Sequence, residues 1–246
     1  MKEEINSFLN YLTVEKGFSV NTLDAYRNDL QQLASFAGEE ATKQGLISSW
    51  ENFSRQVMLS YMLNLKERNY AATTIARKVA ATRSFFGFLK SEGIIKTDPT
   101  ENMSSPSVGK SLPKPITISQ VRQLLEQPAK LNTVEAKRDK AMLELLYASG
   151  MRISELVNLN LGDVNTDEGF VKCFGKGHKE RIVPIYEQAA RSVQEYIAET
   201  RPKLAHKKDG VALFLNPRGD RLTRQGFWQK LKEYAKSAGL DAKISP

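Results

Sequence analysis

The stretch Tyr147-Ala148-Ser149-Gly150-Met151-Arg152-Ile153-Ser154-Glu155-Leu156 separates two helical segments with small residues and places an arginine directly after the break. A second stretch, Gly175-Lys176-Gly177-His178-Lys179-Glu180-Arg181, is a glycine-flanked basic turn between two runs with β-like alternation. Arginine offers a rigid fork for two phosphate oxygens, and lysine offers a compact point charge that also gives up a proton. Arg152 and Lys176 together therefore predict chemistry on a nucleic-acid phosphate.

Around these two stretches, residues 113–246 are predicted to form a mixed α+β domain. Two short runs, 170–174 and 181–185, are the expected antiparallel strands that flank the basic turn. Ser119 is the expected cap of the first helix of this domain. The expected helices are 119–127, 134–149, 154–160, 187–200 and 223–237, with a further short strand at 211–215.

Residues 1–90 are predicted to form a small bundle of four amphipathic helices. Apolar residues recur at helical spacing from Ile5 to Leu12, and the glycines at 17 and 38 are expected to end the first two helices. Asn21 is the expected cap of the second helix. The last three helices are expected at 22–37, 54–68 and 72–91.

Residues 91–112 are expected to link the two domains. Glycine, proline and serine punctuate this segment, a composition typical of a linker and not of a packed element. A hinge at this place would let the two domains grip a ligand from opposite sides.

The charge of the chain is unevenly placed. The net charge of +8 consists of +1 over residues 1–110, with 13 Lys+Arg against 12 Asp+Glu, and +7 over residues 111–246, with 23 against 16. A basic second half favours a polyanionic partner. The alternative is a basic but otherwise ordinary cytosolic protein.

Composition also excludes several classes of protein. One cysteine excludes an internal disulfide framework and indicates a reducing cytoplasm, while two histidines beside that cysteine are too few for a zinc site of the usual kind. The polar N-terminus is not a secretory signal, and no apolar run is long enough to span a membrane. We therefore expect a cytoplasmic protein without a metal or another cofactor.

These stretches resemble the tyrosine recombinase, or phage integrase, family, and most closely its Xer-type members. The front half looks like the core-binding, SAM-like domain of that family, residues 147–156 look like the segment with its first catalytic arginine, and residues 175–184 look like its β-hairpin with the catalytic lysine. Residues 222–228 resemble the start of a helix that lies against DNA. The resemblance implies a mainly helical fold with a small antiparallel sheet, a four-helix domain followed by a mixed α+β catalytic domain that is incomplete.

The resemblance implies a pair of transesterifications through a 3′-phosphotyrosyl intermediate. Arg152 would stabilise the charge of five-coordinate phosphorus, and Lys176 would protonate the leaving 5′-oxygen. Glu155 would orient Arg152. The plain alternatives are a structural ion pair for Arg152, a solubilising turn residue for Lys176 and a solvated carboxylate for Glu155.

Nine further residues are candidate DNA contacts, with a solvated surface as the alternative for each. Helix N-termini favour phosphate, which singles out the two candidates at the start of the last helix. The candidates are Arg77, Lys78, Arg83, Lys114, Lys172, Lys179, Arg181, Arg224 and Gln225. Tyr147 and Tyr234 are expected to pack in the interior and are not candidate nucleophiles. Cys173 is expected to be an apolar filler.

In relatives, the Ser-Pro at 245–246 is followed by a His-x-x-Arg segment and then by the nucleophilic tyrosine. The expectation is a chain truncated before those motifs, which binds DNA and does not cleave it. The predicted function is Xer-like resolution of chromosome or plasmid multimers. The alternatives are the integrase of a mobile element, a non-catalytic DNA clamp, or a basic RNA-binding or regulatory protein. The expected partners are duplex DNA with an inverted-repeat site and further recombinase protomers in a homo- or hetero-tetramer.

Overall fold

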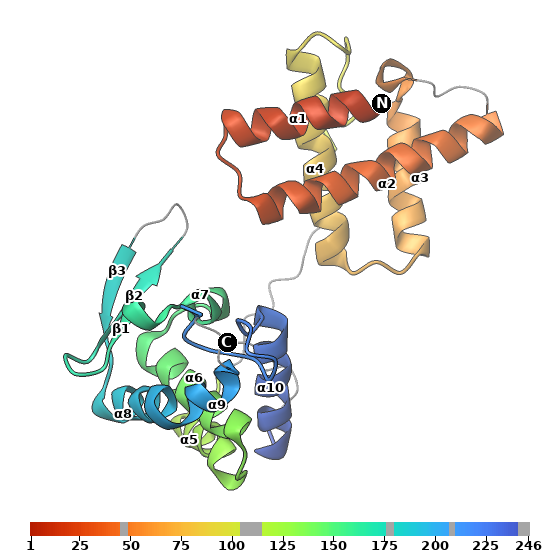
Figure 1. The fold of residues 1–246 in the computed structure, drawn as a ribbon. Helices are drawn as coiled ribbons and strands as arrows, with labels where there is room; N and C mark the ends of the chain where they lie inside the picture. The colour runs from red at the N-terminus through yellow and green to blue at the C-terminus, as the bar shows by residue number, and fades with distance from the viewer. Residues whose placement is uncertain (45–48, 104–114, 176–179, 207–209, 241–246) are drawn as a thin grey trace. The chain divides into compact units, whose positions relative to one another are not determined.

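The chain divides into two units, Met1–Leu112 and Pro113–Pro246 (Figure 1). Apolar side chains at helical spacing form the core of the first unit. The computed structural model describes residues 1–44, 49–103, 115–175, 180–206 and 210–240. The helices of the first unit are α1 (Lys2–Val14), α2 (Val20–Gln44), α3 (Arg55–Glu67) and α4 (Ala72–Ser91), with a 3-10 turn at Trp50–Asn52. Trp50 lies in this core. Its ring packs edge-on against that of Phe85, with the ring centroids 4.9 Å apart, and its indole N–H donates to the carbonyl of Met1 at 3.0 Å.

The bounds of α4 agree with those expected, and Ser54 caps α3 by accepting from the amide of Val57. The expected stop of α2 at Gly38 is wrong, since the helix continues to Gln44. A lone glycine inside a helix costs about 1 kcal/mol and does not end it. Gly17 and Gly150 do lie just past helix ends, with φ of 60° and 59°, because a left-handed residue there closes the last turn.

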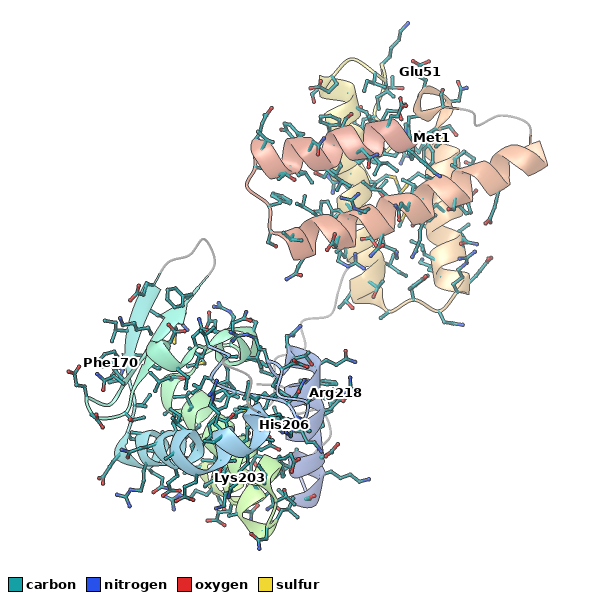
Figure 2. All side chains as sticks on the ribbon, viewed as in Figure 1. Met1, Glu51, Phe170, Lys203, His206 and Arg218 are labelled. Carbon is teal, nitrogen blue, oxygen red and sulfur yellow. The ribbon has the colours of Figure 1, made fainter. Side chains whose placement is uncertain are left out.

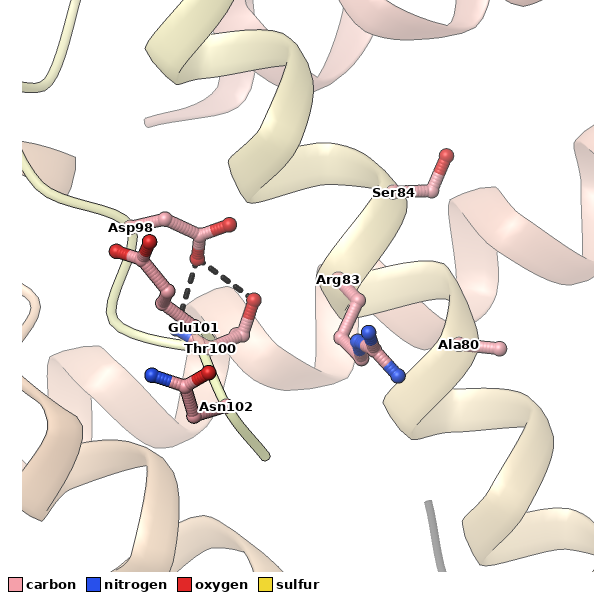
Figure 3. A pocket seen from close by; sticks show the side chains of 7 residues that line it. All are labelled: Ala80, Arg83, Ser84, Asp98, Thr100, Glu101 and Asn102. Atoms are coloured by element: carbon pink, nitrogen blue, oxygen red, sulfur yellow. Dashed lines mark hydrogen bonds between the residues drawn. The ribbon is translucent and has the colours of Figure 1, made fainter. Parts of the chain in front are cut away.

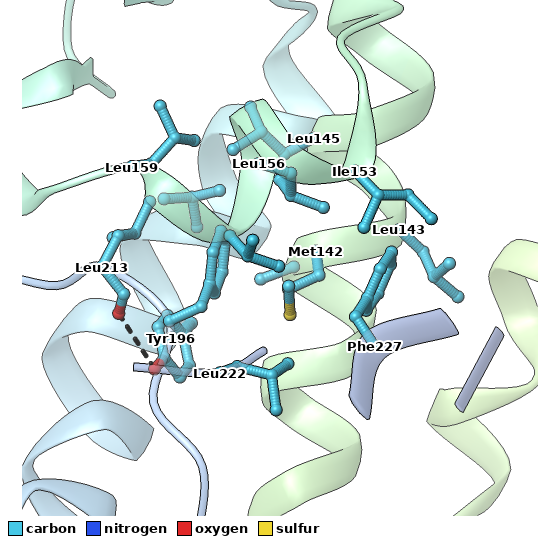
Figure 4. Packing of buried hydrophobic residues seen from close by; sticks show 14 of the residues in the cluster. Met142, Leu143, Leu145, Ile153, Leu156, Leu159, Tyr196, Leu213, Leu222 and Phe227 are labelled. Atoms are coloured by element: carbon cyan, nitrogen blue, oxygen red, sulfur yellow. Dashed lines mark hydrogen bonds between the residues drawn. The ribbon is translucent and has the colours of Figure 1, made fainter. Parts of the chain in front are cut away.

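The second unit contains α5 (Ile118–Glu126), α6 (Val134–Ser149), α7 (Ile153–Asn158), α8 (Glu187–Glu195), α9 (Arg201–Ala205) and α10 (Arg224–Ser237), with a π-helical turn at Tyr196–Thr200 between α8 and α9. Its core joins α6 and α7 to side chains of α10 such as Phe227 (Figure 4). The bounds of α6 agree with those expected. The cap of α5 is Thr117 and not Ser119, because Thr117 and Gln120 form a reciprocal capping box.

The described residues contain one antiparallel sheet in the order β1-β2-β3, formed by β1 (Val164–Asn165), β2 (Phe170–Phe174) and β3 (Glu180–Pro184). Val171 pairs with Val183 and Cys173 pairs with Arg181, so these four side chains share the inner face. Cys173 is fully buried, as expected of an apolar filler. The expected strand at 211–215 is wrong, since that segment makes only isolated bridges, at Ala212 and Leu215.

A buried ion pair ties α6 to the rest of the second unit. Arg138 donates to Asp139 at 2.9 Å and to the carbonyl of Leu215 at 2.8 Å, and both charged side chains are almost fully buried. The hydroxyl of Tyr234, from α10, donates to the second oxygen of Asp139 at 2.9 Å. Tyr234 is therefore an interior residue, as expected, and its pKa is raised by burial and by the charge of Asp139.

Arg138→Met is expected to lower the free energy of unfolding of the second unit by about 3 kcal/mol or more, because Asp139 becomes an uncompensated buried charge. Urea-dependent hydrogen exchange of α6 amides measures this loss. Lys137→Met is the control, since the Lys137 ammonium is exposed and its one ion pair with a described residue is to the exposed Glu199. This variant is expected to lower the free energy of unfolding by less than about 1 kcal/mol. Equal losses in the two variants would contradict the role given to the buried pair.

Candidate functional site

The break between α6 and α7 places Arg152 at the head of a helix. Gly150 takes the left-handed conformation that closes α6, and Arg152, with extended backbone at φ −73° and ψ 151°, is the N-cap of α7. α7 spans six residues, Ile153–Asn158, which is too short to be stable without external contacts. The direction of Arg152 therefore depends on what holds α7.

Glu155 holds the first turn of α7 by accepting from Arg152 twice. The backbone N–H of Arg152 donates to Oε2 at 2.9 Å, and the guanidinium Nη1 donates to Oε1 at 3.0 Å. Arg181, on β3, donates to the same carboxylate with Nη2 at 2.7 Å and Nη1 at 3.4 Å. One carboxylate thus connects two arginines from different elements.

The environment of Glu155 keeps its carboxylate charged although the residue is buried. Burial alone would raise the pKa of Glu155, but the hydrogen bonds from the Arg152 backbone, from Arg181 and from the Arg152 side chain outweigh it and hold that pKa below its ordinary value. The hydrogen bond to Glu155 in turn raises the pKa of Arg181. The cluster therefore carries two positive charges against one negative charge at neutral pH.

The guanidinium of Arg152 is open to solvent, with 73% of its side chain exposed. Within the described residues, the guanidinium makes one side-chain hydrogen bond, from Nη1 to Glu155. Because a guanidinium carries five N–H donors, most of them remain free for an outside acceptor. An exposed cation with a fixed base and unused donors is suited to bind a phosphate or another oxyanion.

The hairpin that follows separates the expected phosphate-binding residues onto opposite faces. Lys172 pairs with Ile182 on the outer face, whereas Arg181 lies on the inner face and is already bound to Glu155. Lys172 and Arg181, both candidate DNA contacts, therefore lie on different faces of the hairpin. Lys176, Lys179 and Lys114 lie outside the described residues, as does His178.

Arg221 secures the other end of α7, and the sequence interpretation missed it. Its guanidinium donates to the carbonyls of Val157 and Leu159 at 2.9 and 2.8 Å and to the side chain of Asn160 at 2.6 Å. Carbonyls at a helix C-terminus lack partners within the helix, so an arginine is well suited to them. Sequence spacing gave no signal for this contact, because Arg221 lies more than sixty residues from its acceptors.

The start of α10 leaves its two candidate residues available. Thr223 caps the helix by accepting from the amide of Gly226 at 3.0 Å, while Arg224 and Gln225 are exposed. One turn later, the Lys232 ammonium lies 3.9 Å from the ring centroid of Trp228. Exposed polar and cationic side chains thus gather on this helix.

The first unit corrects one candidate on α4. Lys78 is buried, and its ammonium donates to Asp29 at 2.9 Å and to Gln32 at 2.7 Å. Its assignment to DNA binding is therefore not supported, because the ammonium is buried and pairs with Asp29 inside the bundle. Arg77 also donates to Asp29 but is partly exposed, and Arg83 is exposed at an open pocket beside Asp98 and Glu101 (Figure 3).

Among the residues that the structure describes, the remaining reactive side chains lie apart from one another. Tyr147 is half-exposed, so the expectation that it packs in the interior is wrong. Tyr186 donates to Glu144, and burial raises its pKa. His206, labelled in Figure 2, ends α9 with φ 47° and contacts the Pro217 carbonyl at 2.8 Å. Across the described ranges, no cluster of His, Cys, Asp and Glu has an arrangement that would hold a metal ion.

Two family profiles match the chain. The phage integrase family matches residues 114–246, and the phage integrase N-terminal SAM-like domain matches residues 5–93. No helix among the described residues is long and apolar enough to cross a membrane.

Two curated relatives are similar over nearly the whole chain. The tyrosine recombinase XerC of Herpetosiphon aurantiacus is 49% identical over 240 residues, which cover 98% of this chain and 77% of that protein. The tyrosine recombinase XerD of Halalkalibacterium halodurans is 42% identical over 246 residues, which cover 100% of this chain and 81% of that protein.

Two solved structures share the fold at low sequence identity. The XerH site-specific recombinase bound to a palindromic difH substrate has a TM-score of 0.72 at 17% identity, covering 98% of this chain and 73% of that chain. A lambda integrase dimer bound to a COC′ core site has a TM-score of 0.66 at 14% identity, covering 98% of this chain and 64% of that chain.

Glu155→Gln is expected to lower the free energy of unfolding of the second unit by about 1–2 kcal/mol at pH 7, because two arginines lose a charged acceptor. The pKa of Glu155 is lowered from 4.5 in the folded chain, so its stabilisation is fully present above that unfolded value and is lost as the pH falls through the folded value. Urea unfolding over a pH series should show a constant difference from wild type at neutral pH that shrinks in acid.

Glu187→Gln is the matched control, since Glu187 is exposed and, within the described ranges, pairs with the exposed Arg191 alone. This variant is expected to differ little from wild type at any pH. A Glu155→Gln difference that persists unchanged at the acid end would contradict an ionic role for this carboxylate.

Proposed function

The chain belongs to the phage integrase family of tyrosine recombinases, and we propose that it acts in site-specific DNA recombination of the Xer type. The observation that carries this proposal is the exposed Arg152 guanidinium, fixed at its base by Glu155 within the domain that matches the family. The similarity to XerC and XerD proteins over nearly the whole chain supports the Xer assignment. Resolution of chromosome or plasmid multimers in the cytoplasm is the specific role proposed.

In this proposal Arg152 binds a non-bridging oxygen of the scissile phosphate. A tyrosine oxygen attacks the phosphorus, the bond to the 5′-oxygen breaks, and a 3′-phosphotyrosyl link forms. The free Arg152 donors stabilise the negative charge that grows on the phosphoryl oxygens, because Glu155 holds the guanidinium before a phosphate binds. Lys176 supplies the proton that the leaving 5′-oxygen takes up.

Contacts away from the reacting phosphate come from both units. We assign Arg224 and Gln225 at the start of α10, Lys172 on the outer face of the hairpin, and Arg77 and Arg83 on α4 to the DNA. The site is proposed to be an inverted repeat bound by recombinase protomers, since an inverted repeat matches the two-fold symmetry of a protein pair. The XerH recombinase is bound to its palindromic difH substrate and the lambda integrase dimer to a COC′ core site, which supports this partner.

Two other functions remain as outcomes of the tests. A mobile-element integrase would share this chemistry but use a different target, and the XerC and XerD relatives favour the Xer role over it. A DNA clamp would bind without cutting. We propose that a polypeptide of residues 1–246 behaves as such a clamp, because none of its eight tyrosines is assigned as the nucleophile.

Arg152→Ala is expected to weaken binding of the chain to duplex DNA and to reduce the slope of log K against log[salt] by about one, because one phosphate contact is lost. Fluorescence anisotropy at several salt concentrations measures both quantities. Arg191→Ala removes an equally charged, exposed arginine of α8 and is expected to leave both nearly unchanged. Preferential binding to duplex RNA of the same sequence would favour an RNA-binding function instead.

No covalent adduct is expected when residues 1–246 are incubated with a nicked suicide duplex and run on a denaturing gel. Tyr196 and Tyr234 are buried and Tyr186 donates to Glu144, so these three hydroxyls are not free to attack a phosphate. A shifted protein band would contradict the prediction. Loss of that band in Tyr147→Phe would then assign the nucleophile to the half-exposed Tyr147.

A further inference from the structure

We propose that Arg181 is a positioning residue for Arg152 and not a DNA contact, and that it acts by fixing the Glu155 carboxylate at the head of α7. This inference rests on the function proposed above, in which Arg152 binds the scissile phosphate. It gives Arg181 a different role from the DNA contact that the sequence analysis predicted.

The register of the sheet directs Arg181 away from the outer face. Arg181 pairs with Cys173, which is fully buried, so its side chain begins on the inner face and runs toward α7. There it meets Glu155, 26 residues earlier in the chain, with two N–H groups on two carboxylate oxygens at 2.7 and 3.4 Å. A two-pronged contact of this kind fixes both the distance and the rotation of the carboxylate.

The carboxylate fixed in this way determines how Arg152 is held. Oε2 accepts both from Arg181 and from the Arg152 backbone amide, and Oε1 accepts the Nη1 group of Arg152. Without Arg181, the carboxylate is free to rotate and to take up two N–H groups of the Arg152 fork. That pairing would consume donors that a phosphate needs and would turn the guanidinium toward α7.

The charge of Arg181 is also already in use. Glu155 is buried and ionised, so removing Arg181 would leave this carboxylate with Arg152 as its only cationic partner in the described residues. An arginine that moved to DNA would have to give up this contact. Because Glu155 accepts from both Arg152 and Arg181, a permanent pairing of Arg181 with Glu155 is favoured over a contact of Arg181 with DNA.

The test is a double-mutant cycle in the full 246-residue chain, with Arg181→Gln, Arg152→Ala and their combination. Anisotropy with duplex DNA gives the affinities. If Arg181 acts through Arg152, Arg181→Gln weakens binding about fivefold in the wild-type background and hardly at all beside Arg152→Ala. The proposal would be overturned if the affinity losses of the two single variants multiplied in the double variant and the slope of log K against log[salt] fell by about one more. Arg181 would then make its own phosphate contact.

A second readout requires no DNA. The Arg152 amide donates to Oε2 of Glu155, so its hydrogen exchange by NMR reports whether the carboxylate stays in place. Arg181→Gln is expected to speed this exchange about tenfold, Arg181→Lys to restore part of the protection, and the control Arg191→Gln to change nothing. An unchanged Arg152 amide, or equal acceleration across all of α6 and α7, would overturn the proposal.

The two measurements separate this inference from the proposed function. If wild type binds no duplex DNA, the proposed function fails while the exchange of the Arg152 amide still decides the positioning role. If DNA binds and depends on Arg152 but not on Arg181, the proposed function stands and the inference fails.

Discussion

The candidate site depends on a single carboxylate that must remain ionised while buried. Glu155 achieves this by accepting four hydrogen bonds from Arg152 and Arg181, which outweigh the cost of its burial. The same atoms join the head of α7 to β3, so the electrostatic requirement and the architectural one are met together.

The short helix that carries Arg152 has almost no stability of its own, and its neighbours supply it. Glu155 holds its first turn, Arg221 binds its last carbonyls, and Leu156 faces the core that α6 and α10 share (Figure 4). In the same unit, the Arg138–Asp139 pair connects α6 with Leu215 and with Tyr234 of α10. Buried charged groups in this unit thus connect separate elements, and one of them, Glu155, contacts the exposed Arg152.

Much of the fold follows from local rules that the sequence displays. The small-residue break at Gly150 requires a left-handed residue, and the bounds of α4 and α6 follow from apolar spacing. Lys78 was misassigned although its spacing of three from Ile75 and four from Thr82 already placed it on the buried face. What the spacing did not reveal was Asp29, 49 residues away, which makes that burial tolerable.

The same limit applies to the site. The register of β2 and β3, which the sequence did not reveal, places Arg181 on the face of Cys173, and the fold brings Glu155 to it. Thr117 and Gln120 carried a visible capping-box signal that was overlooked in favour of Ser119. Local signals therefore predicted where helices begin and break, whereas pairings across tens of residues decided which charges remain free.

The shared carboxylate leaves the cluster with one unit of positive charge that no described residue neutralises. Folding and ligand binding are then linked by mass action, since any anion that occupies this place binds the folded chain and not the unfolded one. Sulfate, free phosphate or heparin should therefore compete with DNA and at the same time protect the protein against heat. Choice of buffer anion thus becomes a variable that changes apparent affinity and apparent melting temperature in opposite directions.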